Sequence, residues 1–591
     1  MSLDNQTVAK YLEEIGVLMR LAGENDFKAI AFDRAARTIE NLDEAIEEII
    51  AEKKLTDIKG IGKSIANDLY ALAETGSIPV LEELNSRVPD GLKQWLNISG
   101  MGPKKIYKIH KELGITEIAE LKQKCEDGSV AELSGMGKKS AEKILKSIAW
   151  MEQFDERCRF DEAERVANMM YEALKNVPGV KKIDVAGSYR RRLETIGDID
   201  ILIAADSEDV AHIFDVFTGH EQVVEVLGRG DTKSSIRTKE GRQVDLRIVT
   251  KKQFAAALMY FTGSKEHNVV MRQRARDRGF ALNEYGLFHL DEDGNTDFEK
   301  PKSFETEADI YKELDLNWVP PELREDRGEF ALFEEKEHIG LVNDSDIRGV
   351  IHAHSTWSDG KFSIEQMARA CIEKGYEYLG ITDHSKTAAY AGGLNIDKVK
   401  RQWEEIDALN QKFSEEGLEF TVFKGIESDI LADGSLDYPD DILAGFDFII
   451  ASVHSGLELP KEKMMMRFEN AIKNPYTTML GHPTGRLLLK RDGSALDMNR
   501  LLELAAKHNV VVEINASPWR LDLDWRFGNK ARDLELITSV NPDAHDTEGI
   551  DDIRYGVYIA RKAKFGKERV LNTLSRDEIT EWFTNRKSTK N

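Results

Sequence analysis

The amino-acid sequence predicts a multidomain α/β protein, with helical hairpin-rich N-terminal domains, a central domain built on a mixed sheet, and a C-terminal barrel of parallel strands. Three observations predict this order. A short glycine motif occurs three times before residue 150, acidic and apolar residues alternate between residues 197 and 249, and short apolar runs alternate with charged helical stretches after residue 345. At 591 residues the chain is long enough for several separate cores.

The composition is that of an ordinary soluble protein, with 41% hydrophobic and 32% charged residues. No stretch of about 18 apolar residues occurs, so we expect no membrane-spanning segment. The first ten residues are polar and lack the apolar run of a secretory signal. The three cysteines, Cys125, Cys158 and Cys371, form no disulfide framework, so we expect a reducing cytoplasm.

The net charge of −24 does not exclude a nucleic-acid partner, because a duplex responds to a local basic face rather than to the total charge. The region from residue 291 to residue 350 holds 19 acidic and 7 basic residues, and so carries half of the acidic excess. The region from residue 181 to residue 280 holds 18 basic and 15 acidic residues. The middle of the chain is therefore compatible with DNA binding.

The repeated motif is Gly-x-Gly followed by lysine or serine, with an apolar, helix-compatible run on either side; its copies begin at Lys59, Ser99 and Ser134. Glycines let a phosphate approach the backbone, and the amides at the start of the second helix attract the anion. One copy is more often a plain turn, whereas three copies favour helix-hairpin-helix binding of the DNA backbone, without base reading. The predicted DNA-binding residues are Gly60, Gly62, Lys63, Gly100, Gly102, Lys104, Gly135, Gly137 and Lys138.

A set of three carboxylates predicts a nucleotidyl-transfer centre. Asp198 and Asp200 lie two residues apart in an alternating segment, so they project from one face of a strand. A second alternating segment, residues 243–249, supplies Asp245 on what we expect to be a neighbouring strand. Such a set can hold two Mg²⁺ or Mn²⁺ ions, which stabilise the attacking 3′-oxygen and the leaving pyrophosphate of an in-line displacement.

The segment before these carboxylates predicts a triphosphate site. Gly187 and Ser188 would offer a backbone amide and a hydroxyl, and Arg191 a charge-assisted donor. An Asp pair alone is more typical of a solvated strand face. The glycine-serine pair, the basic run, the Asp pair and the third Asp, in this order, favour nucleotidyl transfer.

The next segment resembles the thumb of DNA polymerase beta and its family X relatives. The match includes Tyr260-Phe-Thr-Gly-Ser264, Met271-Arg272 and residues 279–285, and the resemblance covers residues 1 to 318. It implies a nucleotidyltransferase palm with a mixed sheet, followed by a thumb. It also implies that Tyr260, Phe261 and Gly263 crowd the incoming sugar, that Asn268 reaches the minor-groove edge of the incoming base, and that Arg272 reaches the template side.

The chain departs from that family at several positions. Ile196 stands where vertebrate members carry a serine that contacts the triphosphate, and Gln243 replaces an arginine. Asp68 stands at the position of the Schiff-base lysine, and Ser64 at that of a 5′-phosphate lysine, while Lys28 matches another binding lysine. A Schiff base needs an amine, so we expect weak or absent deoxyribose-phosphate lyase activity through that position.

After residue 345 the apolar runs, at residues 349–352, 378–382, 420–423, 446–453 and 510–514, predict repeated βα units and a parallel barrel. Polar side chains gather at the ends of such runs, where barrels carry their sites. Imidazole and carboxylate ligands together suit Zn²⁺, Mn²⁺ or Fe²⁺, and bound metals lower the pKa of water enough to supply a nucleophile at neutral pH. The residues of this cluster are His352, His354, Asp359, Asp383, His384, Glu427, His454, His482, Asp543 and His545.

The order of these residues is similar to that of the polymerase-and-histidinol-phosphatase (PHP) family, which implies a distorted (β/α)7 barrel with two or three divalent metals. By that resemblance, Arg486 is a candidate to hold the substrate phosphate. The implied metal ligands are His352, His354, Asp359, His384, Glu427, His454, His482, Asp543 and His545.

A family X polymerase joined to a PHP phosphoesterase resembles bacterial and archaeal PolX. The resemblance implies gap filling in DNA repair and 3′ to 5′ exonuclease activity, and extends to cleavage at abasic sites or processing of blocked 3′ ends. Expected partners are gapped or nicked double-stranded DNA and dNTPs, with no membrane, and we expect a monomer in the cytoplasm, associated with the nucleoid. The residues alone leave two alternatives open: a phosphoesterase for a small sugar or histidinol phosphate, and a DNA-binding scaffold with a decayed polymerase site.

The boundaries that follow from these motifs divide the chain into seven parts. They are an N-terminal helical DNA-binding domain with the first hairpin (1–85), fingers with the second and third hairpins (86–150), a palm (151–259), a thumb (260–318), an acidic linker (319–345), a PHP domain (346–575) and a polar tail (576–591).

Overall fold

The computed structural model describes residues 5–40, 42, 46–58, 60–98, 101–154, 157–291, 301–335 and 339–588. The chain divides into two compact units, Met1–Asp155 with Leu489–Arg491, and Glu156–Leu488 with Asp492–Asn591. The predicted DNA-binding residue Gly100, and parts of the predicted linker and tail, lie outside the described residues.

The first unit is helical in its described part. Its hairpins follow from the repeated motif, because α4 and α7 are capped by Gly62 and Gly102 and α10 begins directly after Gly137. Apolar side chains at helical spacing, among them Leu12 and Trp95, pack into one buried core. The main helices are α1 (Asn5–Leu21), α2 (Asp26–Glu40), α3 (Ile46–Ala51), α4 (Lys63–Thr75), α5 (Pro79–Arg87), α6 (Asp90–Gln94), α7 (Pro103–Leu113), α8 (Ile118–Glu126), α9 (Ser129–Glu132) and α10 (Lys138–Phe154).

The second unit begins with a mixed sheet of five strands in the order β2-β4-β7-β6-β5. Only β4 and β7 pair in parallel, and the other three pairs are antiparallel. Helices α11 and α13 bury apolar side chains in the core that the strands share. The elements are β1 (Cys158–Arg159), α11 (Phe160–Leu174), β2 (Lys182–Val185), α12 (Gly187–Arg190), β3 (Thr195–Ile196), β4 (Asp198–Ala204), α13 (Val210–Thr218), β5 (Val223–Arg229), β6 (Lys233–Thr238) and β7 (Gln243–Val249).

A small helical domain with a hairpin of two strands follows the sheet and has its own core, which includes Met259, Met271 and Tyr311. Buried ion pairs join it to the sheet domain, since Glu307 binds both Arg190 and Arg324. Its elements are α14 (Phe254–Thr262), α15 (Lys265–Arg276), β8 (Phe280–Asn283), β9 (Gly286–His289), α16 (Glu307–Glu313), η3 (Pro321–Leu323) and α17 (Glu329–Glu335).

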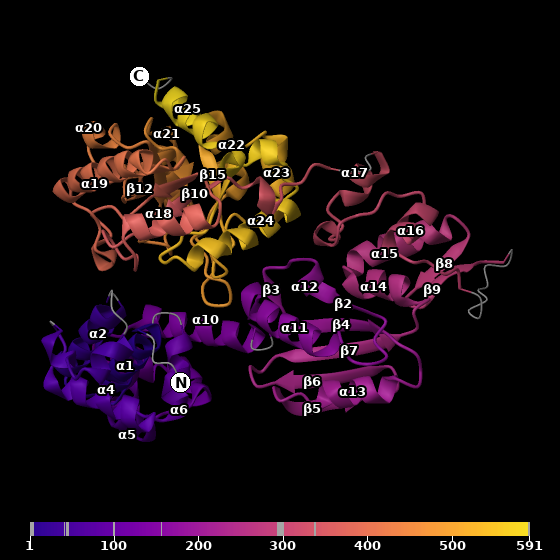
Figure 1. Ribbon diagram of the computed structural model, residues 1–591, viewed down its shortest axis with the longest axis horizontal. Helices are drawn as coiled ribbons and strands as arrows, with labels where there is room; N and C mark the ends of the chain where they lie inside the picture. Colours follow the sequence, from indigo (N-terminus) through magenta and orange to yellow (C-terminus); the bar gives the residue numbers. More distant parts are fainter. Residues whose placement is uncertain are drawn as a thin grey trace. The chain divides into compact units, whose positions relative to one another are not determined.

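The remaining part is a seven-stranded parallel sheet in chain order, β10 to β16, with helices around it (Figure 1). A parallel bridge between Ala353 and Ala544 brings the first strand next to the last, so the sheet is nearly closed into a barrel. The strands are β10 (Gly349–Ala353), β11 (Tyr378–Ile381), β12 (Thr421–Asp429), β13 (Phe448–Ser452), β14 (Met479–Leu480), β15 (Val511–Asn515) and β16 (Thr538–Asn541). The helices are α18 (Ile364–Glu373), α19 (Ile396–Glu415), α20 (Asp440–Leu443), α21 (Lys461–Lys473), α22 (Met498–Lys507), α23 (Gly528–Asp533), α24 (Ile553–Lys562) and α25 (Arg576–Ser588).

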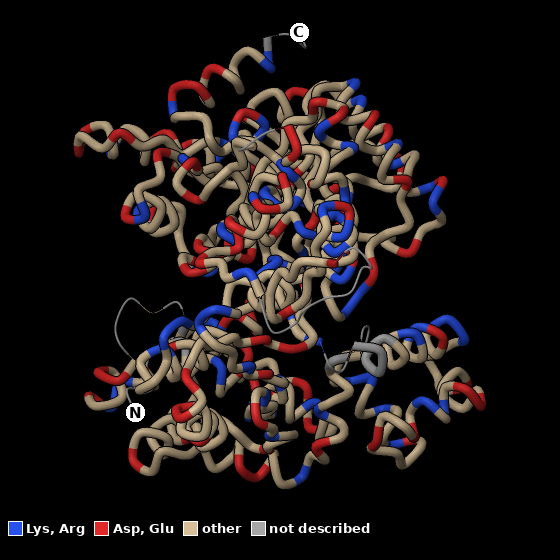
Figure 2. The backbone as a smooth tube through the Cα atoms, turned by 90° about the vertical axis from the view of Figure 1, so that its right-hand side faces the viewer, with Lys and Arg blue, Asp and Glu red and all other residues tan. Residues whose placement is uncertain are grey.

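The predicted fold class is confirmed: helical hairpins, a mixed sheet with a helical domain after it, and a nearly closed parallel barrel. Five of the barrel strands coincide with apolar runs of the sequence, whereas β14 and β16 lie outside them. Figure 2 shows basic and acidic residues interspersed along the chain. Among the described residues, no helix combines the length and the apolar character that crossing a bilayer requires, and the three cysteines are buried and free.

Candidate functional sites

The glycine turns of the first unit leave room for a close ligand. A Cβ atom added at Gly62, Gly102 or Gly137 would meet no atom within 4 Å. Each glycine stands directly before the first residue of a helix longer than eight residues, so backbone amides face this open space. Lys63, Lys104 and Lys138 are exposed just past the turns, and Lys104 forms an ion pair of 2.6 Å with Asp26. The turns therefore have the shape and charge for a phosphate backbone.

The three predicted carboxylates of the sheet domain lie together. Asp200 on β4 is paired in register with Asp245 on the neighbouring parallel strand β7, as expected from the sequence. Ligand atoms of Asp198, Asp200 and Asp245 fall within 4.8 Å of one another and form a group that could hold a metal ion. Burial raises the pKa of Asp200 to about 7, and the neighbouring carboxylates of Asp198 and Asp245 add to the effect.

Gly187 is required by the position of Asp200. Its φ is +64°, and a Cβ atom there would lie 2.3 Å from Asp200 Oδ2. The backbone of the predicted phosphate turn is therefore in direct contact with a predicted metal ligand. Ser188, the next predicted residue, lies beside it in the same short helix, α12.

Arg191 joins this turn to the helical domain. Its Nη1 donates to the carbonyl of Thr262 at 2.5 Å, and its Nε donates to Glu325 Oε1 at 3.1 Å. A Cβ atom on Gly263 would lie 3.1 Å from the same Nη1, so glycine at that position gives the guanidinium its room. The sequence predicts both Arg191 and Gly263 as nucleotide-binding residues, and the structure brings them together.

The other predicted nucleotide contacts lie on α14 and α15. Tyr260 and Phe261 are in edge-to-face contact, with ring centroids 5.3 Å apart. The Asn268 amide donates to the Tyr260 carbonyl at 2.7 Å, so reaching a base would require this bond to open. Arg272 is exposed. These four roles stay predictions.

The two departures near this site have different surroundings. Ile196 is fully buried in the apolar core, so no polar group there faces a triphosphate. Gln243 donates to Asp245 Oδ1 at 3.0 Å, and Lys233 on β6 forms an ion pair of 2.5 Å with Asp245 Oδ2. Lys233, which sequence reasoning missed, supplies next to Asp245 a cation of the kind that the replaced arginine would bring.

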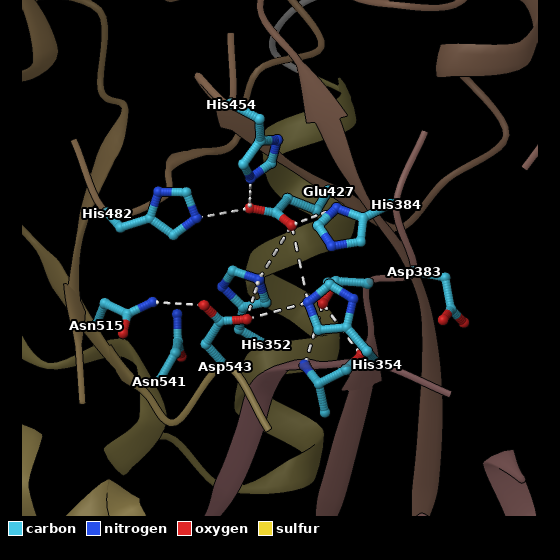
Figure 3. A network of polar contacts seen from close by, with 12 residues as sticks. His352, His354, Asp383, His384, Glu427, His454, His482, Asn515, Asn541 and Asp543 are labelled. Atoms are coloured by element: carbon cyan, nitrogen blue, oxygen red, sulfur yellow. Dashed lines mark hydrogen bonds and ion pairs between the residues drawn. The ribbon is translucent and has the colours of Figure 1, made fainter. Parts of the chain in front are cut away.

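The barrel residues form a second, larger cluster at the carboxyl ends of the strands (Figure 3). Among the described residues of the barrel, three groups could hold a metal ion, and the first group shares His354 with the second and His384 with the third. The ninth predicted ligand, His482, joins the cluster through Glu427, with Nε2 and Oε1 2.9 Å apart. The groups are His354, Asp359, His384 and His545; His352, His354 and Asp543; and His384, Glu427 and His454.

Buried ligand atoms without a hydrogen-bond partner support metal binding. His352 Nε2 and His354 Nδ1 are inaccessible to solvent and lack one, and the equally buried His384 Nδ1 and Glu427 Oε2 lie 3.0 Å apart without hydrogen-bond geometry. A buried polar atom without a partner costs free energy. Several such atoms around the same space therefore favour a site that binds metal ions. Nitrogen and carboxylate donors in this mixture suit Zn²⁺, Mn²⁺ or Fe²⁺.

Two carboxylates that orient the histidines were missed from the sequence. Glu513 Oε1 lies 2.6 Å from His352 Nδ1, and Asp429 Oδ1 lies 3.1 Å from His454 Nδ1. Each carboxylate fixes the proton on Nδ1 and so leaves Nε2 facing the cluster. The signal for Glu513 was a lone acidic residue within the apolar run that became β15.

Asp383, which the sequence places beside the ligands, has another role. Its carboxylate accepts from Ser355, Ser358 and Gln402, with distances of 2.5–2.6 Å from their side chains. Figure 3 shows it apart from the other carboxylates. It belongs to none of the candidate metal groups among the described residues, and it is not one of the predicted ligands.

Arg486, the predicted phosphate-binding candidate, is engaged inside the fold. Its Nη1 binds Asp524 at 2.6 Å, and its other nitrogens donate to the carbonyls of Arg520 and Leu521. It thereby braces the segment that carries Arg520, whose Nε lies 3.8 Å from Asp543 Oδ2. Arg520, which sequence reasoning missed, is the cation nearer to the metal cluster.

Five family models match parts of the chain. They are a helix-hairpin-helix domain over residues 3–78, a SAM-like helix-hairpin-helix tandem over 93–149, the DNA polymerase beta palm over 157–249, the DNA polymerase beta thumb over 257–325, and the PHP domain over 351–517. The fold and the two sites thus define a family X polymerase architecture joined to a PHP phosphoesterase domain.

Similarity to individual proteins identifies the family within this class of polymerases. The chain is 40% identical to the DNA polymerase/3′-5′ exonuclease PolX of Bacillus subtilis, over 98% of this chain and 99% of that protein. It therefore belongs to the PolX family. It is also 29% identical to a probable phosphatase of Caldanaerobacter subterraneus, over 39% of this chain and 89% of that one. A similarity of 23% to DNA polymerase lambda of Rattus norvegicus covers 48% and 49% of the two chains.

Proposed function

We propose that this chain is a DNA-directed DNA polymerase that fills short gaps during repair, and that its PHP domain removes nucleotides from 3′ ends. The observation that carries the first half is the contact of Gly187 with Asp200, which puts a phosphate-binding turn directly against a metal-binding carboxylate. The near full-length similarity to a protein named for both activities supports the combination.

In the polymerase site, the residues of this chain hold and orient the reactants. Asp198, Asp200 and Asp245 would hold Mg²⁺ or Mn²⁺, which supplies charge stabilisation for the in-line displacement. The Gly187 and Ser188 turn would face the triphosphate, with Arg191 donating from the side of the helical domain. Tyr260 and Phe261 would contact the sugar, Asn268 the base edge and Arg272 the template.

In the PHP site, the nine predicted ligands would hold two or three Zn²⁺, Mn²⁺ or Fe²⁺ ions, which activate water for attack on a phosphodiester. Glu513 and Asp429 would keep the histidines in the metal-binding tautomer. Arg520 would draw the scissile phosphate to the cluster, because it is the cation beside Asp543 and 20% of its side chain is exposed. Arg486 would act through Arg520.

We also propose roles for the helical hairpins and further activities for the PHP site. The hairpin residues would bind gapped or nicked duplex DNA through its phosphates, and the seven predicted parts would be its domains. Cleavage at abasic sites and 3′-end processing would use the PHP site. Lyase activity would be weak, since Asp68 on α4 offers no amine. We propose a monomer in the cytoplasm, near the nucleoid, in keeping with its free, buried cysteines.

Primer extension on a gapped duplex with Mg²⁺ and Mn²⁺ tests the polymerase half. We expect Asp200→Ala to abolish nucleotide addition. The exposed Asp215→Ala is the control, because Asp215 pairs with Arg229 on the edge strand β5. Full extension by the Asp200 variant would refute the assignment.

A substrate comparison tests the PHP half, because some relatives of this domain are named as probable phosphatases. The proposal predicts release of mononucleotides from a 3′-labelled primer, and little release of phosphate from histidinol phosphate or sugar phosphates. The opposite preference would favour the small-molecule alternative. Borohydride trapping of a 5′-deoxyribose-phosphate end tests the lyase expectation, which a strong adduct within residues 1–80 would contradict.

A further inference from the structure

The loop between the phosphate turn and the metal-binding strand is held by the PHP domain. This loop, residues 191–194, joins α12 to β3 and lies within the second compact unit. Three of its four residues contact side chains of the barrel, and those side chains come from α24 and from the 3-10 helix η6 (Trp525–Phe527).

The first contact is made by Lys562, the last residue of α24. Its side chain is fully buried, and its Nζ donates to the Arg191 carbonyl at 3.0 Å, to the Glu322 carbonyl at 3.0 Å and to Glu325 Oε1 at 2.6 Å. All three protons of the ammonium group are thereby used. Burial lowers the pKa of Lys562, and the Glu325 carboxylate opposes that effect.

Lys562 and Arg191 share one carboxylate. Glu325 Oε1 accepts from Lys562 Nζ and also from Arg191 Nε at 3.1 Å. Lys562 therefore fixes both the backbone of Arg191 and the carboxylate that orients its guanidinium. The opposite side of that guanidinium faces Gly263.

Two further contacts hold the rest of the loop. Glu194 accepts from Trp525 Nε1 at 3.0 Å and from Arg526 Nη1 at 2.5 Å. The Arg192 guanidinium lies 4.0 Å from the centre of the Tyr558 ring. The backbone of Arg192 has a φ of +57°, which residues other than glycine rarely adopt. A backbone strained in this way persists when its surroundings hold it, and here those surroundings include the barrel.

We propose that the PHP domain sets the affinity of the polymerase site for nucleotide, with Lys562 as a positioning residue that acts through Arg191. The inference rests on the proposed polymerase function. In this proposal the barrel contributes to synthesis independently of its metal cluster. The barrel residues described in contact with the loop are Lys562, Trp525, Arg526 and Tyr558, and none of them is a predicted metal ligand.

Steady-state gap filling by the full-length chain tests the inference. We expect Lys562→Met, which keeps length and removes the donors, to raise the KM for dNTP about fivefold to tenfold and to change kcat less than twofold, as for loss of one oriented charged contact. The Kd for gapped DNA and the exonuclease rate on a single-stranded primer should stay unchanged. Lys564→Met is the matched control, because Lys564 is also buried but donates to Arg327 and Asn529 instead.

A dNTP KM within twofold of wild type for a folded Lys562→Met variant would overturn the inference. If that variant does not fold, as judged by lost exonuclease activity, Trp525→Phe is the second test. It removes the donor to Glu194 and shrinks the ring that lies 4.3 Å from Lys562 Nζ, so the inference requires a raised dNTP KM. An unchanged KM for Trp525→Phe would then overturn it. Failure of the wild type to add nucleotides would instead overturn the proposed function.

Discussion

At the scale of single residues, the arrangement of the barrel site depends on a carboxylate that is not among the predicted metal ligands. Glu513 is fully buried and binds His352 Nδ1, the His482 backbone amide and the Asn541 amide, with distances of 2.6, 2.6 and 2.9 Å. One carboxylate thus orients one predicted ligand and anchors the segment of another. Outer partners of this kind raise the basicity of a histidine ligand and fix its tautomer.

Replacing Glu513 with Gln should therefore weaken the PHP site alone. We expect the 3′ to 5′ exonuclease activity, or the metal affinity measured by chelator competition, to fall about 10- to 100-fold, with gap filling unchanged. Glu503→Gln is the matched control, because Glu503 pairs with Lys530 on the surface. Wild-type metal affinity and exonuclease activity in the Glu513 variant would contradict the role assigned to this residue.

Gly187→Ala tests the packing of the polymerase turn. The new Cβ atom would lie 2.3 Å from Asp200 Oδ2 and force a predicted metal ligand to move. A displacement of about 1 Å at a reacting centre costs about 100-fold, so we expect a loss of that order in the rate of nucleotide addition. Gly228→Ala on β5, where an added Cβ atom meets nothing within 4 Å, serves as the control. Equal rates for the two variants would refute the argument.

At the scale of elements, charged groups join the sheet domain to the barrel. Burial would raise the pKa of Glu194, but Arg526 and Arg486 outweigh it and lower that pKa to about 2. A carboxylate with a depressed pKa in the folded protein stabilises the fold above its ordinary pKa of about 4.5, and this contribution disappears as the pH falls from about 4.5 toward 2.

Glu194→Gln should therefore lower stability at neutral pH and not in acid. The upper limit of its effect at pH 7 is between about 3 and 4 kcal/mol, because the pKa of Glu194 falls from 4.5 to about 2 in the folded protein. Thermal unfolding of both proteins between pH 7 and pH 2.5 measures this. We expect the difference in Tm to be largest at pH 7 and to shrink below pH 4.5. A difference that grows in acid would show that the sign is wrong.

The helical hairpins predict a salt-dependent, sequence-independent affinity. Lys63→Ala and Lys138→Ala should each weaken binding to duplexes of different sequence equally, and each should reduce the slope of log K against log salt by about one. Fluorescence anisotropy at several salt concentrations measures both quantities. The control is Lys93→Ala, since Lys93 binds Asn85 and Asp90 away from the turns. A loss confined to one DNA sequence would contradict backbone binding.

At the scale of the whole molecule, the sequence was most informative where chemistry imposes spacing. Asp198 and Asp200 lie two residues apart in β4, and His352 in β10 lies two residues before His354, so a common face for each pair could be predicted. Strand β14 could not, because it has only two residues and no alternation. The role of Glu513 could not be predicted for another reason. Its strand is buried on both faces, so the apolar run has no alternation that would show which way the acidic side chain points.

Contacts between distant segments were also beyond the sequence. Trp525 and Glu194 are 331 residues apart, and no local pattern pairs them. For the same reason Arg486 was the more visible phosphate candidate: it follows a histidine motif, whereas Arg520 approaches Asp543 only after the chain has folded. Local patterns therefore indicate the candidate ligands, whereas the residues that position them are brought into place by tertiary packing.

The central claim is that one chain carries two separate reaction centres. Its most direct test is a single gapped duplex with a 5′-labelled primer, followed with and without dNTPs. Asp198→Ala/Asp200→Ala should shorten the primer and never extend it, while His352→Ala/His354→Ala should extend it and never shorten it. His508→Ala, at the end of α22 and outside the metal groups, should do both. Normal shortening by the double-histidine variant, or loss of both activities in the double-aspartate variant, would contradict the claim.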